Sequence, residues 1–200
     1  MKQEQKHSRT QFQIDRIAFF SDALIAIAIT LMVLEIKILE LGTSITFGQF
    51  WEQYSFSVTL HIIALLIGFI TIGNIWMHHH DLFGHIINYN KKLTRINLYF
   101  LFSVTLLPIS ISFLFTENEP PLLPRFCYFT NLLLVNLLFY LMVVLIFSKH
   151  YNFSSIKDRV EIKRIKMFSL IDALIILLVL VISVINVNEF FCRFPLLFRG

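Results

Sequence analysis

The sequence predicts an all-α protein, a polytopic bundle of transmembrane helices with five clear spans and a short possible sixth. Of the 200 residues, 56% are hydrophobic and 15% are charged, against roughly 45 to 50% hydrophobic residues in soluble domains. Nearly all of the charged residues lie between long apolar runs. A bilayer core of about 30 Å needs about 20 apolar residues in a helix, so at most six or seven crossings fit, without a sizeable extramembrane domain.

Five apolar runs have the length of one crossing each. In chain order they cover 17–36, 54–77, 96–115, 126–147 and 167–187. The first run is not a cleavable signal peptide, because Asp22 and Glu35 interrupt it and no A-x-A-like site closes it. Pro108 predicts a kink in the third run, since proline has no amide proton for the helical ladder.

The segment after Val187 is apolar but too short to cross, because Glu189, Arg193 and Pro195 interrupt it. We interpret it as a stub or a re-entrant piece. The whole chain, 1–200, is then one integral membrane domain. Its predicted parts are an N-terminal segment (1–15), a helix bundle (16–187) and a short or divergent C-terminal segment (188–200).

The positions of lysine and arginine predict a cytoplasmic N terminus. With that orientation, thirteen of the 17 basic residues fall on the inner side, as the positive-inside rule requires. They are Lys2, Lys6, Arg9, Arg16, Lys91, Lys92, Arg95, Lys149, Lys157, Arg159, Lys163, Arg164 and Lys166. The outer loops then hold only Lys37 and Arg125, and residues 1–15 are cytoplasmic.

The sequence argues against several other classes of protein. There is no HExxH, GxSxG or phosphate-binding glycine loop, so we expect neither an enzyme nor a bound cofactor. Cys127 and Cys192 form no CxxC pair. The three consecutive histidines 78–80 point about 100° apart on a helix and cannot share one metal ion. The net charge of +4 comes from basic residues beside apolar runs, so no nucleic-acid partner is expected.

One level of the predicted bundle gathers polar side chains. Asp22 lies six residues after Arg16, about 9 Å along a helix, which keeps its carboxylate in the cytoplasmic leaflet, where it needs partners. The residues expected at this depth are Ser21, Asp22, Trp76, His79, His80 and Asn97. Indole and imidazole N–H groups can donate to a carboxylate there. We interpret the level as structural, with a proton relay from Asp22 through histidine as the alternative.

A second pattern is a stripe on the first helix. Ile27, Thr30, Leu31 and Leu34 have the spacing i, i+3, i+4, i+7 and therefore share one face. Periodicity alone favours a packing or lipid-facing surface in which the threonine hydroxyl bonds back to the helix. Small residues, including Ala64 and Gly68 on the second helix, favour close helix packing.

These residues also occur in a recognisable order. Arg16, Phe20-Ser21-Asp22, Ala26-Ile27, Thr30 and Leu34 lie in the first run; Trp76, His79 and His80 close the second; Asn97 and Leu106-Leu107-Pro108 lie in the third. Together they resemble the RxxxFSD...AI..T signature and the next two motifs of the transmembrane protein 175 potassium channel family, in its short prokaryotic form. The resemblance covers about the first 115 residues.

The resemblance implies a homotetramer in the bacterial inner membrane, surrounded by lipid, in which four copies of the first helix line a central potassium pathway. Ile27 then matches the family's hydrophobic constriction, Thr30 its threonine ring, and Leu31 and Leu34 further apolar layers. A network of Arg16, Phe20, Ser21, Asp22, Trp76, His79, His80 and Asn97 would hold the helix in place. No TVGYG filter is present, so selectivity would arise at side chains and K⁺ would bind only in transit.

One feature departs from the family, whose short subunits have six helices. Here either the C-terminal end is truncated or divergent, or two shorter helices share residues 167–198. The function expected from the sequence is passive potassium conduction. The rivals are a proton-coupled secondary transporter using Asp22, His79 and His80, and a membrane scaffold without flux.

Overall fold

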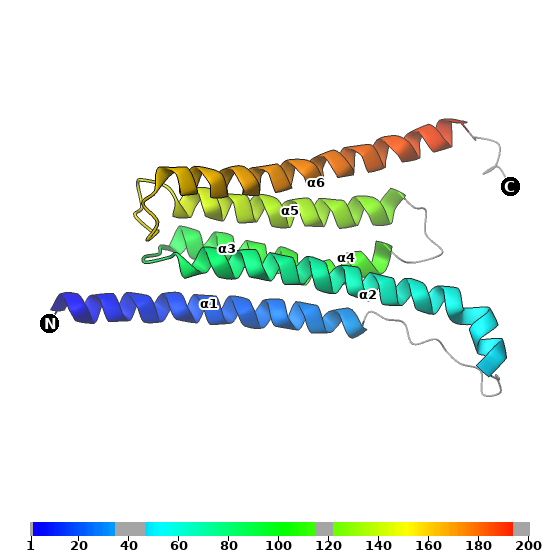
Figure 1. The fold of residues 1–200 in the computed structure, drawn as a ribbon, viewed down its shortest axis with the longest axis horizontal. Helices are drawn as coiled ribbons and strands as arrows, with labels where there is room; N and C mark the ends of the chain where they lie inside the picture. The colour runs from blue at the N-terminus through cyan, green and yellow to red at the C-terminus, as the bar shows by residue number, and fades with distance from the viewer. Residues whose placement is uncertain (1, 35–46, 115–121, 194–200) are drawn as a thin grey trace.

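The computed structural model describes residues 2–34, 47–114 and 122–193, and most of these residues form helices (Figure 1). The helices are α1 (Lys2–Leu34), α2 (Phe47–Gly84), α3 (Lys91–Thr105), α4 (Leu107–Leu114), α5 (Leu122–Ile146) and α6 (Arg159–Arg193). Five segments are long and apolar enough to cross a membrane, with α3 and α4 together forming one of them. The predicted five-span, all-α architecture is therefore confirmed.

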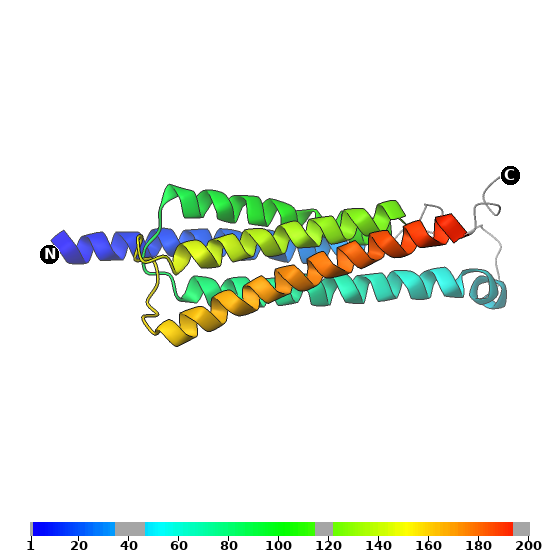
Figure 2. The ribbon, with the colours of Figure 1, turned by 90° about the horizontal axis from the view of Figure 1, so that it is seen from above.

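The helices run side by side as a bundle with α1 at one edge and α6 at the other (Figure 1). Helix α1 packs against α2, α3 and α4, while α5 packs against α3, α4 and α6. From above, α6 crosses the rest of the bundle obliquely (Figure 2). Helix α6 is peripheral: only Ser169 and Ala173 are buried among its described side chains.

Most helices extend beyond the apolar runs that predicted them. Helix α1 begins at Lys2 rather than at residue 17, and α6 begins at Arg159 rather than at residue 167. Hydropathy marks only the lipid-facing part of a helix, whereas polar residues continue its hydrogen-bond ladder into water. Residues 35–36 of the first predicted run lie outside the described residues.

The predicted kink in the third span is present. Helix α3 ends at Thr105 and α4 begins at Leu107, with Leu106 between them. Pro108 cannot donate to the carbonyl of Val104, and that carbonyl instead accepts from the amide of Leu106. The missing proline N–H thus divides one apolar run into two helices.

The C-terminal expectations are resolved in part. Helix α6 is continuous from Arg159 to Arg193, so the prediction of two shorter helices within residues 167–198 is wrong for its described part. The reason is local: residues 159–193 contain no proline or glycine to break the ladder. Residues 188–193 continue α6, and residues 194–200 of the predicted C-terminal segment lie outside the described residues.

Helix α1 packs into the core of the bundle through one face. Helix α1 contributes Ile25, Ala28 and Met32, all at most 3% exposed. Gly68 of α2 faces Met32: a Cβ built on Gly68 would lie 2.8 Å from Met32 Sδ. The close approach of α1 and α2 thus depends on a residue without a side chain, as the small-residue pattern predicted.

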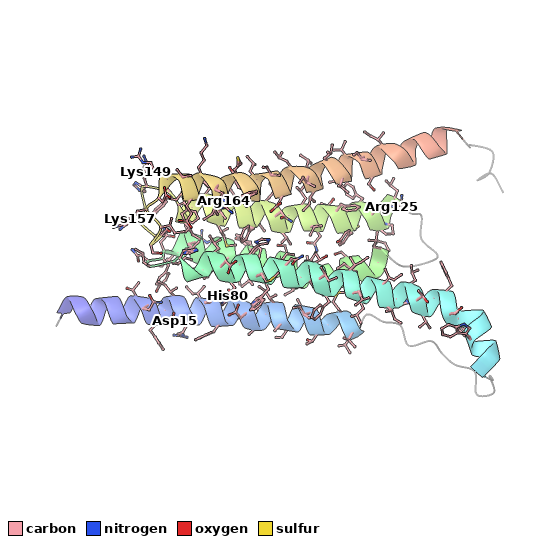
Figure 3. All side chains as sticks on the ribbon, in the orientation of Figure 1. Asp15, His80, Arg125, Lys149, Lys157 and Arg164 are labelled. Carbon is pink, nitrogen blue, oxygen red and sulfur yellow. The ribbon has the colours of Figure 1, made fainter. Side chains whose placement is uncertain are left out.

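One end of the molecule, called here the basic end, carries Lys149, Lys157 and Arg164 beside the N terminus, whereas Arg125 lies at the opposite end (Figure 3). Two connections are joined there: the amide of Ile87 donates to Phe153 O at 2.8 Å, and that of Ser155 donates to His85 O at 2.9 Å. These bonds fix the α2–α3 connection against the α5–α6 connection.

Candidate functional site

The first polar contact of the site joins α1 to α2. Trp76 Nε1 donates a hydrogen bond to Asp22 Oδ1 at 2.9 Å. The ring of His80 lies against the same indole, with ring centroids 5.4 Å apart. The tryptophan therefore gives the intramembrane carboxylate one of the donors that its depth requires.

The second contact is a buried chain of hydrogen bonds across three helices. His79 Nε2 and Asn97 Oδ1 are 2.9 Å apart, Asn97 Nδ2 donates to Ser21 Oγ at 2.9 Å, and Ser21 Oγ donates to Ile17 O at 2.8 Å. Since an amide oxygen only accepts, His79 donates through Nε2. Asn97 thus uses both ends of its amide to hold α2 and α1 together.

The imidazole of His79 is enclosed by aromatic rings. It stacks on Phe83 with centroids 4.3 Å apart and on Phe100 with centroids 5.2 Å apart. Its Nδ1 has no hydrogen-bond partner among the described residues. Sequence reasoning missed this arrangement, because Phe100 lies on another helix and no local spacing points to it.

Other members of the predicted network are not bonded across helices. The Arg16 guanidinium lies 6.0 Å from the ring of Phe12 on its own helix, and Phe20 is 52% exposed. Within the described residues, no hydrogen bond joins Asp22 to a histidine; its partner is Trp76. An indole N–H has no basic lone pair to pass a proton on, so the geometry does not favour the proton relay.

The predicted stripe lies on the outer face of α1. Ile27, Leu31 and Leu34 are 51%, 37% and 77% exposed, whereas Ile25 and Ala28 are fully buried. At about 100° per residue, the stripe points away from the buried face. Among the described residues, therefore, α1 presents a branched aliphatic surface that the other helices leave partly exposed.

Thr30 is the polar member of this face. Its Oγ1 donates to Ile27 O at 2.8 Å, so the predicted back-bonding of the threonine is confirmed. Because the hydroxyl hydrogen is used within the helix, the exposed oxygen presents lone pairs, which can coordinate a cation.

Residues 16–108 match the family model described as "Endosomal/lysosomal potassium channel TMEM175". This stretch contains every candidate site residue named above. Over this stretch the chain is similar to the TMEM175 family. The resemblance noted in the sequence is thus confirmed. TMEM175 is an ion channel family and not an enzyme family, in line with the expectation that this chain is no enzyme.

Curated relatives that are named potassium channels agree with this similarity. A potassium channel of Chryseobacterium sp. (strain P1-3) is 33% identical over 103 residues, 52% of this chain and 50% of the relative. A potassium channel of Streptomyces collinus is 32% identical over 97 residues, 46% of this chain and 43% of the relative. The matched part thus spans about half of each relative.

The fold agrees over a longer stretch than the sequence. The crystal structure of a lysosomal potassium-selective channel TMEM175 homolog from Chamaesiphon minutus superposes with a TM-score of 0.70 at 25% identity, covering 88% of this chain and 89% of that one. Helices α5 and α6 lie outside residues 16–108. The chain is a multi-pass membrane protein with the TMEM175 fold.

No metal site emerges beside the network. Among the described residues, no three His, Cys, Asp or Glu side chains are placed to hold a metal ion. The adjacent histidines diverge as their helical spacing predicts: His79 bonds Asn97, His80 contacts Trp76, and His78 lies near Phe139, with centroids 6.3 Å apart.

Proposed function

We propose that the chain is one subunit of a homotetrameric potassium channel whose pore is lined by α1. The observation that best supports this proposal is the exposed face of Ile27, Thr30, Leu31 and Leu34. This face lies inside the segment that matches the TMEM175 family. A threonine that bonds back to its helix also occurs on lipid-facing surfaces, so the choice of a cation pathway rests on the position of this face inside the matched segment. The relatives named potassium channels support the choice of ion.

In this proposal four Ile27 side chains form the narrowest point of the pore. A ring of branched aliphatic groups gates by dewetting, because water and ions leave a narrow apolar passage together. The Thr30 oxygens, bonded inward through their hydrogens, replace part of the water that the ion loses. K⁺ is easier to dehydrate than Na⁺, so weak ligands suffice for a preference and still permit exit.

The polar level gives α1 a fixed rotation in the subunit. Asp22 bonds to Trp76 and Ser21 to Asn97, while the pore-facing residues lie on the other side of the same helix. A rotation of α1 that moved Ile27 off the axis would break these bonds. Arg16 and Phe20, on the exposed side, would lie at the entrance of the pore.

The proposed orientation places the basic end in the cytoplasm. Lys149, Lys157 and Arg164 lie at this end together with the N terminus (Figure 3). Basic residues beside membrane spans favour the cytoplasmic side. The membrane would be the bacterial inner membrane, the location suggested by the prokaryotic relatives.

The test is potassium flux through the purified protein in proteoliposomes. Ile27→Asn should hydrate the constriction and raise the K⁺ leak severalfold. Ile182→Asn, at a 47% exposed position of α6, is the matched control and should leave the leak unchanged. K⁺ flux should exceed Na⁺ flux in the unmodified protein.

Three results would contradict the proposal. An unchanged leak for Ile27→Asn in a correctly folded tetramer would remove Ile27 from the pathway. Flux that saturates with substrate and requires a pH gradient would instead indicate the proton-coupled transporter, and the absence of any flux would indicate a scaffold.

A further inference from the structure

A cavity of about 870 Å³ lies near the basic end, apart from the α1 face. It is bounded by α2, α3, α5 and α6, on the side of the bundle where α6 crosses over (Figure 2). Its volume falls within the range of small-molecule sites, about 300 to 1,000 Å³. No α1 residue lines it, so neither the proposed pore nor the Trp76–Asp22 contact accounts for it.

The walls combine aromatic rings with three carboxyl side chains. Phe100, Phe139 and Phe168 supply rings from three helices. The acidic lining residues are Asp81, Glu161 and Asp172, and the lining also holds His78, His80, His85 and Arg164, whose guanidinium lies 5.7 Å from the Phe168 ring centroid. Carboxylates beside aromatic faces attract cations, because both present negative charge to the ligand.

Ser169 gives the first sign that a ligand belongs here. It lines the cavity, is only 6% exposed, and its Oγ has no hydrogen-bond partner among the described residues. A helical serine ordinarily bonds back to the carbonyl four residues earlier. A buried hydroxyl without a partner costs free energy, which a ligand that donates to it would recover.

Asp172 gives the second sign. It lies in the membrane span of α6, eight residues beyond Arg164 and so about 12 Å farther from the basic end. Its carboxylate has no hydrogen-bond or ion-pair partner in the described part of the chain. Asp172 is exposed in the single chain, and an intramembrane carboxylate needs a counter-charge or water, either of which can reach it through the cavity that it lines.

Asn136 completes a set of acceptors on the lining. Its Nδ2 donates to Leu132 O at 2.9 Å, so Oδ1 is the group it offers to a ligand. Asp172, Ser169 and Asn136 each bring an acceptor oxygen to the lining, and a primary ammonium group has three hydrogens to donate. An anion would meet acceptors and carboxylates instead, and a neutral ligand would leave the charge of Asp172 uncompensated.

We infer that this cavity binds a small organic ammonium ion, with the ammonium at Asp172, Ser169 and Asn136 and the apolar body between the phenylalanine rings. Depth favours a soluble amine over a phospholipid headgroup. A headgroup ammonium lies at the membrane surface, at the level of Glu161 and Arg164, whereas Asp172 lies deeper. The ligand would enter ammonium-first from the basic end.

The experiment is calorimetric titration of the full chain in detergent with 2-phenylethylamine and with 2-phenylethanol, which has the same apolar body without the charge. The amine should bind at least about tenfold more tightly than the alcohol, as expected for hydrogen bonds to a charged group. Asp172→Asn should remove this preference, and Ser169→Ala should weaken amine binding by about three- to tenfold. Asp158→Asn, which changes an acidic residue outside the cavity, should leave both affinities unchanged.

Equal affinity for amine and alcohol would overturn the inference, as would unchanged amine binding in both Asp172→Asn and Ser169→Ala. The inference would also be overturned if the folded chain did not bind the amine. A neighbouring subunit or a lipid chain that fills the cavity would give that result. Competition by dioctanoyl phosphatidylethanolamine would identify a lipid as the source of the ammonium, and its absence would identify a soluble amine. These measurements involve no flux, so they stand or fall independently of the proposed pore.

Discussion

Trp76 Nε1 lies 2.9 Å from Asp22 Oδ1, and this hydrogen bond joins residues that are 54 positions apart in the sequence. It places a donor from α2 against the carboxyl group of Asp22 on α1. The rotation of α1, and with it the direction of Ile27, is thereby linked to the position of α2.

The first prediction concerns this bond. Trp76→Phe removes the N–H but keeps an aromatic ring, and should lower the free energy of unfolding by about 0.5 to 2 kcal/mol, the range measured for interhelical hydrogen bonds in membranes. Asp22→Ala should reduce the yield of tetramer relative to the unmodified protein. The K⁺/Na⁺ flux ratio of the tetramers that still form should change little. Unfolding in denaturing detergent and size-exclusion chromatography measure the two effects.

Tyr99→Phe is the control for the loss of one polar hydrogen from an exposed aromatic side chain. In a double-mutant cycle, Trp76→Phe should cost little once Asp22 is alanine. If the losses in the free energy of unfolding from Trp76→Phe and Asp22→Ala simply added in the double mutant, the hydrogen bond would contribute nothing to stability. Normal tetramer yield with a changed ion ratio would instead place Asp22 in the conduction pathway.

The second prediction concerns the buried amide of Asn97. Asn97→Ala removes the partner of both His79 and Ser21. Leaving buried polar groups unsatisfied should cost about 1 to 3 kcal/mol of stability. Leu98→Ala, at the neighbouring exposed position, should lower the free energy of unfolding much less in the same assay. An equal loss for the two substitutions would argue that the chain of hydrogen bonds is not formed.

The third prediction concerns the contact of α1 with α2. Gly68→Leu would drive a side chain into buried Met32, and overpacking of this kind should cost about 1 to 3 kcal/mol. Gly73→Leu introduces the same residue where a Cβ meets nothing within 4 Å and should be tolerated. Met32→Ala should restore much of the stability lost in Gly68→Leu; no rescue would mean that the helices approach each other differently.

The fourth prediction concerns orientation. In a background of Cys127→Ser and Cys192→Ser, Lys149→Cys at the basic end should react with a membrane-impermeant maleimide only from the cytoplasmic side. Gly48→Cys, at the exposed start of α2, should react only from the outside. The opposite pattern in intact cells and inverted vesicles would reverse the proposed topology.

Much of the fold could be predicted because membrane insertion is governed by local composition. A run of about 20 apolar residues spans the bilayer whatever its neighbours are, so five spans followed from the sequence, and Pro108 predicted the break between α3 and α4. The helix ends could not be predicted as well. The extension of α1 to Lys2 and of α6 to Arg193 depends on helix formation outside the apolar core, which hydropathy does not measure.

The sequence also determined which residues lie at the same depth in the bundle, because the helix rise per residue converts a position in the sequence into a distance along the helix axis. Only the tertiary structure decided the partners at that level: Asn97 bonds both His79 and Ser21, while Asp22 takes Trp76. Pairing depends on the rotation and crossing of whole helices, which are set by packing across the bundle. For the same reason the cavity that Asp172 shares with Ser169 became visible only once α6 was placed across α2 and α5.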